Sequence, residues 1–334
     1  MQKTILITGG AGYIGSHAVK LLLEHHYKIV VFDNLSNGYR QAITQLEDIG
    51  EIKFIKGDLR NPAEIDHVFE TEKIDAVMHF AAQCSVDESM KHPELYFDNN
   101  TIGTYNLLEA MRKSSADYLI FSSTCAIYGE TAYLPVDEKH PQNPVNPYGE
   151  SKLLSEKIIK WYGRSHGLNY VILRYFNVCG ASSDGLIGDS KKPSLLLMQN
   201  AVRGAMDIEP FYLTCPPVDT PDGTPIRDYI DVEDLVEAHY HALMYLEKGG
   251  CSDVFNLGNG KGYSVKEIIK KVEDIFGITM PIPTGKPREG EYAEIYASPR
   301  KVREAFDWQA AKSLQESITS LKKWYTNHPN GYDE

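Results

Sequence analysis

The sequence lacks any apolar run long enough to cross a membrane and has few cysteines. No stretch approaches the roughly 18 apolar residues that indicate a membrane helix, so we expect no membrane association. The cysteines form an odd, scattered set without a C-x-x-C pair: Cys84, Cys125, Cys179, Cys215 and Cys251. Such a set argues against a disulfide framework and a metal site. Together with a strand-like N-terminus, MQKTILITGG, that leaves no room for a signal peptide, it predicts a cytoplasmic protein.

Basic residues are also scarce. The chain of 334 residues has 34 Lys and Arg against 46 Asp and Glu, a formal charge of −12. A nucleic-acid partner is therefore not expected, because phosphate neutralisation needs a net basic face. An anionic small substrate remains open if its site concentrates its own arginines.

Short apolar runs do recur, separated by amphipathic stretches of helical length. We expect strands at 4–9, 28–34, 53–58, 75–82, 118–124 and 169–175, and helices at 16–25, 63–72, 99–113 and 148–165. Strands that are apolar throughout and joined by helices indicate a parallel sheet that is covered on both faces. The predicted fold is a doubly wound α/β (Rossmann) domain.

The alternation weakens after about residue 176. Residues 177–226 are rich in loops, and CPPVDTPDGTP (215–225) is rich in proline. A helix at 232–246 and a strand at 253–258 follow, then a helix at 265–276. We expect 1–176 to form the sheet domain, with 231–258 returning to it, and 177–230 with 259–334 to form a smaller α/β C-terminal domain.

GGAGYIG (9–15) directly follows the first strand and opens the first helix. Glycines at 9, 12 and 15 allow a tight turn and the close approach of a pyrophosphate to the helix N-terminus. Asp33 ends the second strand, 18 residues past Gly15, where it would accept hydrogen bonds from the adenosine ribose. Its charge would repel a 2′-phosphate, so the motif predicts NAD rather than NADP.

Other polar residues end strands at the same edge. Asp58 ends the third strand, where it would either bond the adenine or cap a turn. FAAQ (80–83) ends the fourth strand, at the edge where such sheets bind ligands.

The chemistry is predicted at NPYGESK (146–152), which opens a helix. Tyr148 and Lys152 are four residues apart and share a helix face, while Thr124 ends the fifth strand. Lowering a tyrosine pKa from about 10 by ~3 units takes ~4 kcal/mol, which a nearby ammonium and a positive nicotinamide ring would supply. Tyr148 would then take a proton from a carbinol that Thr124 aligns, as hydride leaves to NAD.

These motifs resemble those of the extended short-chain dehydrogenase/reductases, and most closely the UDP-glucose 4-epimerases. The similar segments run along nearly the whole chain: 9–17, 80–82, 88–100, 146–152, 173–181, 220–235 and 287–291. The resemblance implies epimerisation at C4 of a UDP-hexose through a transient 4-keto sugar, with NAD tightly bound and not consumed. Residues 1–176 would then bind NAD and the C-terminal domain the UDP-sugar.

The resemblance also implies roles residue by residue. Tyr148 would be the acid/base, Lys152 its electrostatic partner and Thr124 the third catalytic residue. The implied cofactor-binding residues are Gly9, Gly12, Tyr13, Ile14, Gly15, Asp33, Asn34, Leu35, Asn37, Asp58, Leu59, Phe80, Ala81, Ala82, Asn99, Ser122, Tyr148, Lys152 and Phe176. The implied substrate-binding residues are Thr124, Asn177, Leu195, Arg227, Arg288, Glu291 and Ile295.

The sequence departs from the family pattern in three places, one of which is the loop LTCPPVD (213–219), to which the resemblance assigns no role. Ser194-Leu195 stands where relatives usually carry Asn-Leu or His-Leu, and Glu291 where aspartate is common. Ile295 matches a position whose size limits N-acetyl sugars, which predicts turnover of UDP-N-acetylhexosamines too; a shift of one residue would put Tyr296 there instead.

Alternative functions remain. A nucleotide-sugar 4,6-dehydratase usually carries Asp-Glu directly after the threonine, whereas Cys125 and Ala126 stand here. A UDP-glucuronate epimerase or decarboxylase would need extra cationic residues to bind the sugar carboxylate, and none can be assigned in this sequence. A UDP-arabinose/xylose 4-epimerase stays open, and a non-catalytic NAD-binding sensor is opposed by the intact Tyr148, Lys152 and Thr124.

The resemblance further implies a homodimer, formed through helices at about 94–113 and 148–165. The apolar residues that would face the partner, or pack within one subunit, are Tyr96, Leu107, Met111, Ile158 and Trp161.

Overall fold

The computed structural model describes residues 2–114, 116–192, 194–286 and 292–332. Its larger sheet has seven parallel strands in the order β3-β2-β1-β4-β5-β6-β9. The strands are β1 (Thr4–Thr8), β2 (Lys28–Asp33), β3 (Ile52–Lys56), β4 (Ala76–His79), β5 (Tyr118–Thr124), β6 (Asn169–Tyr175) and β9 (Asp253–Leu257). The predicted doubly wound fold is confirmed.

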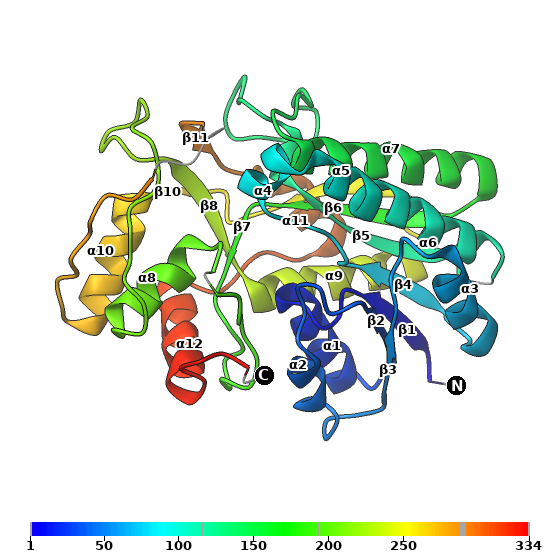
Figure 1. Ribbon diagram of the computed structural model, residues 1–334. Coiled ribbons are helices and arrows are strands. Elements are labelled where there is room, and N and C mark those ends of the chain that lie inside the picture. The colour runs from blue at the N-terminus through cyan, green and yellow to red at the C-terminus, as the bar shows by residue number, and fades with distance from the viewer. Residues whose placement is uncertain (1, 115, 193, 287–291, 333–334) are drawn as a thin grey trace.

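Helices cover both faces of this sheet (Figure 1). One face carries α1 (Tyr13–Glu24) and α9 (Val232–Glu247), and the other carries α3 (Pro62–Thr71), α6 (Gly103–Arg112) and α7 (Pro147–His166). Successive strand residues point to opposite faces, so Ile5 and Ile7 join the cluster under α1 and α9 while Leu6 joins the cluster under α6. Because both faces are buried, the strands are apolar throughout.

Short helices connect these layers. They are α2 (Arg40–Thr44), α4 (Val86–Lys91), α5 (Pro93–Tyr96), the π-helical turn η1 (Phe97–Ile102), the 3₁₀ turn η2 (Cys125–Ile127) and α11 (Arg300–Phe306). The turn η1 runs directly into α6, so the single helix predicted at 99–113 is a π-helical turn followed by an α-helix.

A smaller sheet lies beyond the carboxyl ends of the large one. Its central strand β8 (Ile226–Asp231) pairs with β7 (Asn177–Cys179), β10 (Gly262–Ser264) and β11 (Glu294–Ile295). Three helices gather beside it in Figure 1: α8 (Leu197–Ala205), α10 (Val265–Phe276) and α12 (Leu314–Asn327). Their apolar faces meet in a cluster that includes the fully buried Trp324.

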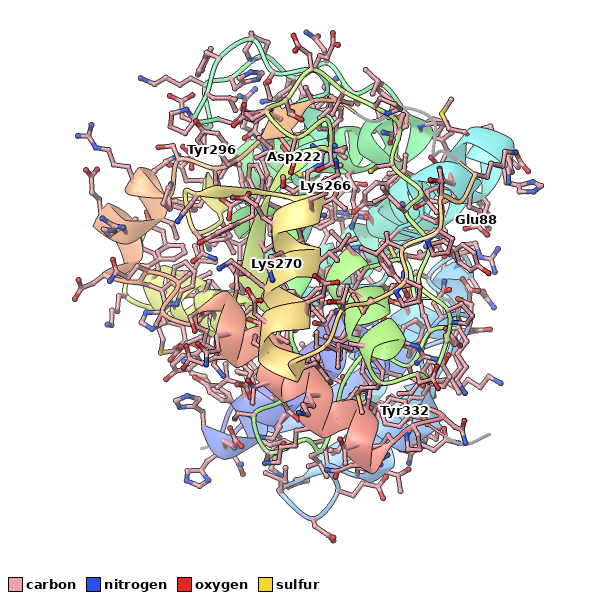
Figure 2. All side chains as sticks on the ribbon, turned by 90° about the vertical axis from the view of Figure 1, so that its left-hand side faces the viewer. Glu88, Asp222, Lys266, Lys270, Tyr296 and Tyr332 are labelled. Atoms are coloured by element: carbon pink, nitrogen blue, oxygen red, sulfur yellow. The ribbon has the colours of Figure 1, made fainter. Side chains whose placement is uncertain are left out.

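Figure 2 looks onto this smaller lobe, with α10 in front. The helix begins with a capping box between Ser264 and Glu267 and ends at Gly277, whose φ of 67° is left-handed. Asp222 lies at its start, where its carbonyl accepts a 2.7 Å hydrogen bond from Lys266 Nζ. The proline-rich loop that ends near Asp222 is therefore fastened to α10.

Chain order and topology interleave the two lobes. Strand β8 of the small sheet continues directly into α9, which packs on the large sheet, and β9 then supplies the seventh strand of that sheet. Which lobe binds which ligand stays a prediction.

Candidate active site

A cavity of ≈ 400 Å³ lies between the two lobes at the carboxyl ends of the parallel strands. This is where open α/β sheets bind ligands. Most residues predicted for the site line it: Gly9, Gly12, Tyr13, Ile14, Gly15, Asp33, Asn34, Asn37, Leu59, Phe80, Ala81, Ala82, Asn99, Thr124, Tyr148, Lys152, Phe176, Asn177, Leu195 and Arg227.

The glycine turn between β1 and α1 has no room for side chains. A Cβ on Gly9, whose φ is +73°, would lie 2.5 Å from the amide nitrogen of Ala81, and a Cβ on Gly15 would lie 2.1 Å from the carbonyl oxygen of Gly9. The turn thus brings bare backbone and the N-terminus of α1 to the cavity wall, where a dinucleotide pyrophosphate would fit.

Asp33 fixes the next loop along this wall. Its Oδ2 accepts a 3.0 Å hydrogen bond from Ala11 N, and its Oδ1 accepts one of 2.8 Å from Leu35 N. Burial raises the pKa of this carboxyl, while the two amide hydrogen bonds oppose the rise. Each carboxylate oxygen has a second acceptor position, so Asp33 suits a ribose diol. Glycine turn and acid together fit NAD.

Four predicted residues lie outside the cavity lining. Leu35 lines a neighbouring cavity of ≈ 540 Å³. Asp58 binds the guanidinium of Arg60 and accepts from the Arg60 amide at 2.9 Å. Asp58 therefore makes the turn-capping contact that the sequence left open as the alternative to adenine binding. The hydrogen bonds from Arg60 hold the pKa of Asp58 well below its usual value.

Ser122 and Ile295 are the other two. Ser122 presents its carbonyl oxygen to Lys152, and Ile295 is fully buried in an apolar cluster that includes Phe176. Arg288 and Glu291 lie outside the described residues.

Helix capping positions Tyr148. Pro147 occupies the first turn of α7, and Asn146 Oδ1 accepts a 2.8 Å hydrogen bond from Gly149 N. Asn146 itself lines the cavity. Tyr148 is thereby held at the start of the helix, where it forms a hydrogen bond with Thr124.

Burial raises the pKa of the Tyr148 hydroxyl well above its usual value, and the neighbouring Tyr175 raises it further, while the hydrogen bond with Thr124 opposes both. This direction is opposite to the lowering expected from the sequence. The reason is that removing a phenolate from water outweighs the favourable contacts present here. A positive group beside the ring therefore has to reverse a larger cost than the sequence indicated.

Lys152 lies one turn further along α7. Its Nζ donates a 2.8 Å hydrogen bond to the Ser122 carbonyl and lies 4.8 Å from the centre of the Phe121 ring. Burial lowers the pKa of Lys152 to about 8, and the charges of Cys84 and Glu156 act against this. The pKa of Lys152 thus lies closer to neutral pH than that of an exposed lysine, and the amine still carries its proton for the most part at pH 7.

Arg227 enters the cavity from the smaller lobe. It donates to the carbonyl oxygens of Ile226 at 2.9 Å and Tyr292 at 2.8 Å, and its guanidinium lies 4.8 Å from the centre of the Tyr292 ring. These contacts hold a cation in the wall that the smaller lobe contributes to the cavity.

Several cavity residues were not predicted. They include Cys84, Cys125, Tyr175, Asp189 and Lys191. The positions of Tyr175 and Cys125 could have indicated that they line the cavity, because each lies at the carboxyl end of a strand. Asp189 and Lys191 lie in a loop without any periodic pattern, so nothing in the sequence indicated them.

Metal and disulfide chemistry find no support in the described ranges. No group of three metal-ligating side chains occurs there, and the cysteines are not joined by a disulfide. None of the helices described has the length and apolar character needed to span a bilayer. The cytoplasmic location stays a prediction.

Comparison with known proteins agrees with this geometry. The chain is 42% identical over 332 residues to the UDP-glucose 4-epimerase of Lactobacillus helveticus, covering 99% of both chains. It is 39% identical over 340 residues to UDP-arabinose 4-epimerase 1 of Arabidopsis thaliana, covering 98% of this chain and 80% of that one.

A solved structure of similar shape is UDP-glucose 4-epimerase from Bifidobacterium longum in complex with NAD+ and UDP. It has a TM-score of 0.94 and 36% identity, over 99% of this chain and all of that one. Residues 5–258 match the model of the NAD dependent epimerase/dehydratase family. Glycine turn, Asp33 and the Tyr148–Lys152 pair all fall within that match, and the chain belongs to this family.

Proposed function

We propose that this protein is an NAD-dependent UDP-glucose 4-epimerase, which inverts C4 of a UDP-hexose through a transient 4-keto sugar. The observation that carries the proposal is the convergence of Tyr148, Thr124 and Lys152 in the cavity that the glycine turn and Asp33 also line. The identity to curated UDP-glucose 4-epimerases over nearly the full length supports the substrate class.

Held by the glycine turn and Asp33, NAD would supply the hydride acceptor for oxidation at C4 and the hydride donor for the return to the opposite face. Tyr148 acts as the acid/base: it takes the proton of the C4 hydroxyl during oxidation and gives it back during reduction. Thr124 donates to the tyrosine oxygen and aligns the sugar hydroxyl. Its Oγ1 also accepts a 3.1 Å hydrogen bond from Ala126 N, which leaves the hydroxyl hydrogen directed elsewhere.

Lys152 stabilises the phenolate form of Tyr148. Because burial alone keeps the phenol protonated, the ammonium has to be held close and dry to oppose that cost. The 2.8 Å hydrogen bond to the Ser122 carbonyl holds the amine in place.

Binding has to be uneven for this reaction. The UDP must be gripped while the sugar turns over to present its other face. We assign Asn177, Leu195 and Arg227 to the UDP, because they line the side of the cavity formed by the smaller lobe; Arg288 and Glu291 belong to the same proposal. The large-sheet lobe would then bind NAD and the smaller lobe the UDP-sugar.

Two other substrates belong to the same proposal. UDP-N-acetylhexosamines are the first candidate, because Ile295 is smaller than a tyrosine; its side chain lies behind the cavity wall, in the apolar cluster that includes the lining residue Phe176. UDP-arabinose is the second candidate, favoured by the 39% identity to a UDP-arabinose 4-epimerase. A 4,6-dehydratase is disfavoured because Cys125 and Ala126 line the cavity after Thr124, where neither supplies an acid or base.

We also propose a homodimer. Ile102, Tyr105 and Trp161 are 47%, 43% and 62% exposed on η1, α6 and α7, and such large apolar side chains indicate an interface. Tyr96, Leu107 and Met111, expected on this face, are instead buried. They pack within the subunit, the alternative that the sequence left open.

The test uses the purified protein without added NAD. UDP-galactose, UDP-GalNAc and UDP-arabinose are offered separately, and H4 of each sugar is followed by proton NMR. We expect UDP-galactose to convert to UDP-glucose, and the Tyr148→Phe variant to keep its NAD but lose turnover. Normal turnover in that variant would refute the acid/base role. UDP-GalNAc turnover below a hundredth of the UDP-galactose efficiency would exclude the N-acetyl sugars.

A further inference from the structure

Helix α7 presents three polar residues to the end of β5, spaced four apart on one face. Tyr148 bonds Thr124, Lys152 Nζ donates to the Ser122 carbonyl at 2.8 Å, and Glu156 Oε1 accepts from Ser123 Oγ at 2.6 Å. Successive residues of the strand end thus each meet a different residue of the helix. We call this set of three contacts the α7–β5 ladder.

The third contact of the α7–β5 ladder, between Glu156 and Ser123, is reinforced by an arginine from the neighbouring strand. Arg174 on β6 is paired in register with Ser123, and it donates to both oxygens of Glu156, at 2.9 Å from Nε and 2.5 Å from Nη2. Its Nη1 also donates to the Tyr128 hydroxyl at 3.0 Å. Glu156 and Ser123 are fully buried and Arg174 is 1% exposed.

A buried ion pair such as Glu156–Arg174 contributes little to the free energy of unfolding. Removing two charges from water costs several kcal/mol per ion, and well-packed apolar residues often serve as well or better. What apolar residues cannot do is fix a strand end by directional hydrogen bonds, or place a negative charge one helical turn from a lysine.

We propose that Glu156 and Arg174 are positioning residues, which lock the end of β5 against α7 and keep Lys152 in its ammonium form beside Tyr148. This inference rests on the proposed function, because it assigns the pair a task only if Tyr148 and Lys152 act on the substrate. Neither Glu156 nor Arg174 lines the cavity.

Charged and titratable groups from several elements surround Lys152 and Glu156. Lys152 faces Cys84 from the loop after β4, His79 from β4 and Glu156 from its own helix. Glu156 faces Arg174 and Tyr170 from β6 and Lys160 from α7, the last at 3.3 Å. Replacing the carboxylate by an amide removes an anion near Lys152 and leaves the Arg174 cation uncompensated. Both changes disfavour the ammonium.

The experiment compares Glu156→Gln with the parent enzyme in kcat and KM for UDP-galactose from pH 6 to 10. We expect the alkaline limb of the kcat profile to move down by about one pH unit, with KM within about twofold, since the variant leaves the cavity lining intact. Glu156→Asp should restore part of the shift. The matched control is Glu150→Gln, the same change on α7 at a partly exposed position outside the ladder, which should leave the profile unmoved.

A second variant covers the case in which Glu156→Gln does not fold. Ser123→Ala removes one hydrogen bond and keeps the ion pair, and it should lower kcat about fivefold without changing KM. A lower melting temperature with an unmoved pH profile in Glu156→Gln, or normal kcat in Ser123→Ala, would overturn the inference. If Tyr148→Phe is also fully active, the proposed function has failed instead.

Discussion

The side-chain amide of Asn37 donates a 2.7 Å hydrogen bond to Oε1 of Gln83. Asn37 lies in the loop after β2 and Gln83 in the loop after β4, and both line the cavity. The Gln83 backbone is fixed in turn by two hydrogen bonds with the side chain of Asn100, of 2.8 and 3.0 Å. The contact therefore ties two loops together beside the glycine turn.

Breaking this tie should speed the loss of NAD. A hydrogen bond of this kind contributes roughly 1 kcal/mol, so we expect Gln83→Ala to release NAD about five times faster. The measurement is the NAD that stays with the protein through gel filtration and dilution. Gln315→Ala, an exposed position on α12, is the control, and equal retention in both variants would contradict the prediction.

Thr124 should matter through its hydroxyl rather than its shape. Thr124→Val keeps the volume but removes the hydrogen bond with Tyr148, which near an ionised group is worth roughly 2 kcal/mol. We expect kcat for UDP-galactose to fall about 30-fold. Thr124→Ser keeps the hydroxyl and should stay within a few-fold of the parent, so similar losses in both variants would point to packing instead.

His239 should make stability depend on pH. Its Nε2 lies 3.0 Å from Ser122 Oγ and its Nδ1 2.8 Å from the Leu235 carbonyl, and burial lowers its pKa from 6.5 to about 4. The folded state thus binds the proton more weakly than the unfolded state. The stabilisation is complete above about pH 6.5 and is lost as pH falls toward 4, by about 3 kcal/mol in all.

The measurement is urea unfolding at pH 7 and pH 4.5. His239→Gln should lose less stability between these values than the parent, because its side chain does not titrate. The other buried groups, including His17 and His79, contribute to both proteins and cancel in the comparison. His92→Gln, at an exposed position, should behave as the parent, and identical slopes in all three would contradict the prediction.

Trp161 should decide the oligomeric state. Its side chain is 62% exposed on α7, so a charge there disturbs no core. We expect Trp161→Glu to shift the mass measured by light scattering from dimer to monomer. Tyr212→Glu, 52% exposed in the smaller lobe, should not. A monomeric parent protein would refute the proposed dimer itself.

The large sheet could be predicted because its evidence is local. The strand at 118–124 begins with an apolar run and has the bounds that were predicted. The glycine turn lies between a strand and a helix that can each be recognised from their own sequence. The strands of the smaller lobe were harder to predict from the sequence. Strands β7, β10 and β11 are short, and pairing with β8 rather than their own pattern holds them together.

Long-range contacts also explain what the site predictions missed. Glu156 lies on the helix that carries Tyr148, yet its partners Ser123 and Arg174 come from two different strands. Only the register between those strands brings them to one carboxylate. The raised pKa of Tyr148 had the same origin, because burial depends on the whole fold.

Two of the connections between the lobes contain almost no loop. A single residue, Phe176, separates β6 from β7, and β8 passes straight into α9, with Asp231 as the N-cap. At these two points there is little chain that could act as a hinge between the cavity walls. The proposed reaction would then require the pyranose ring to turn over within the cavity of ≈ 400 Å³, and we expect the dimensions of that cavity to limit the size of the sugar.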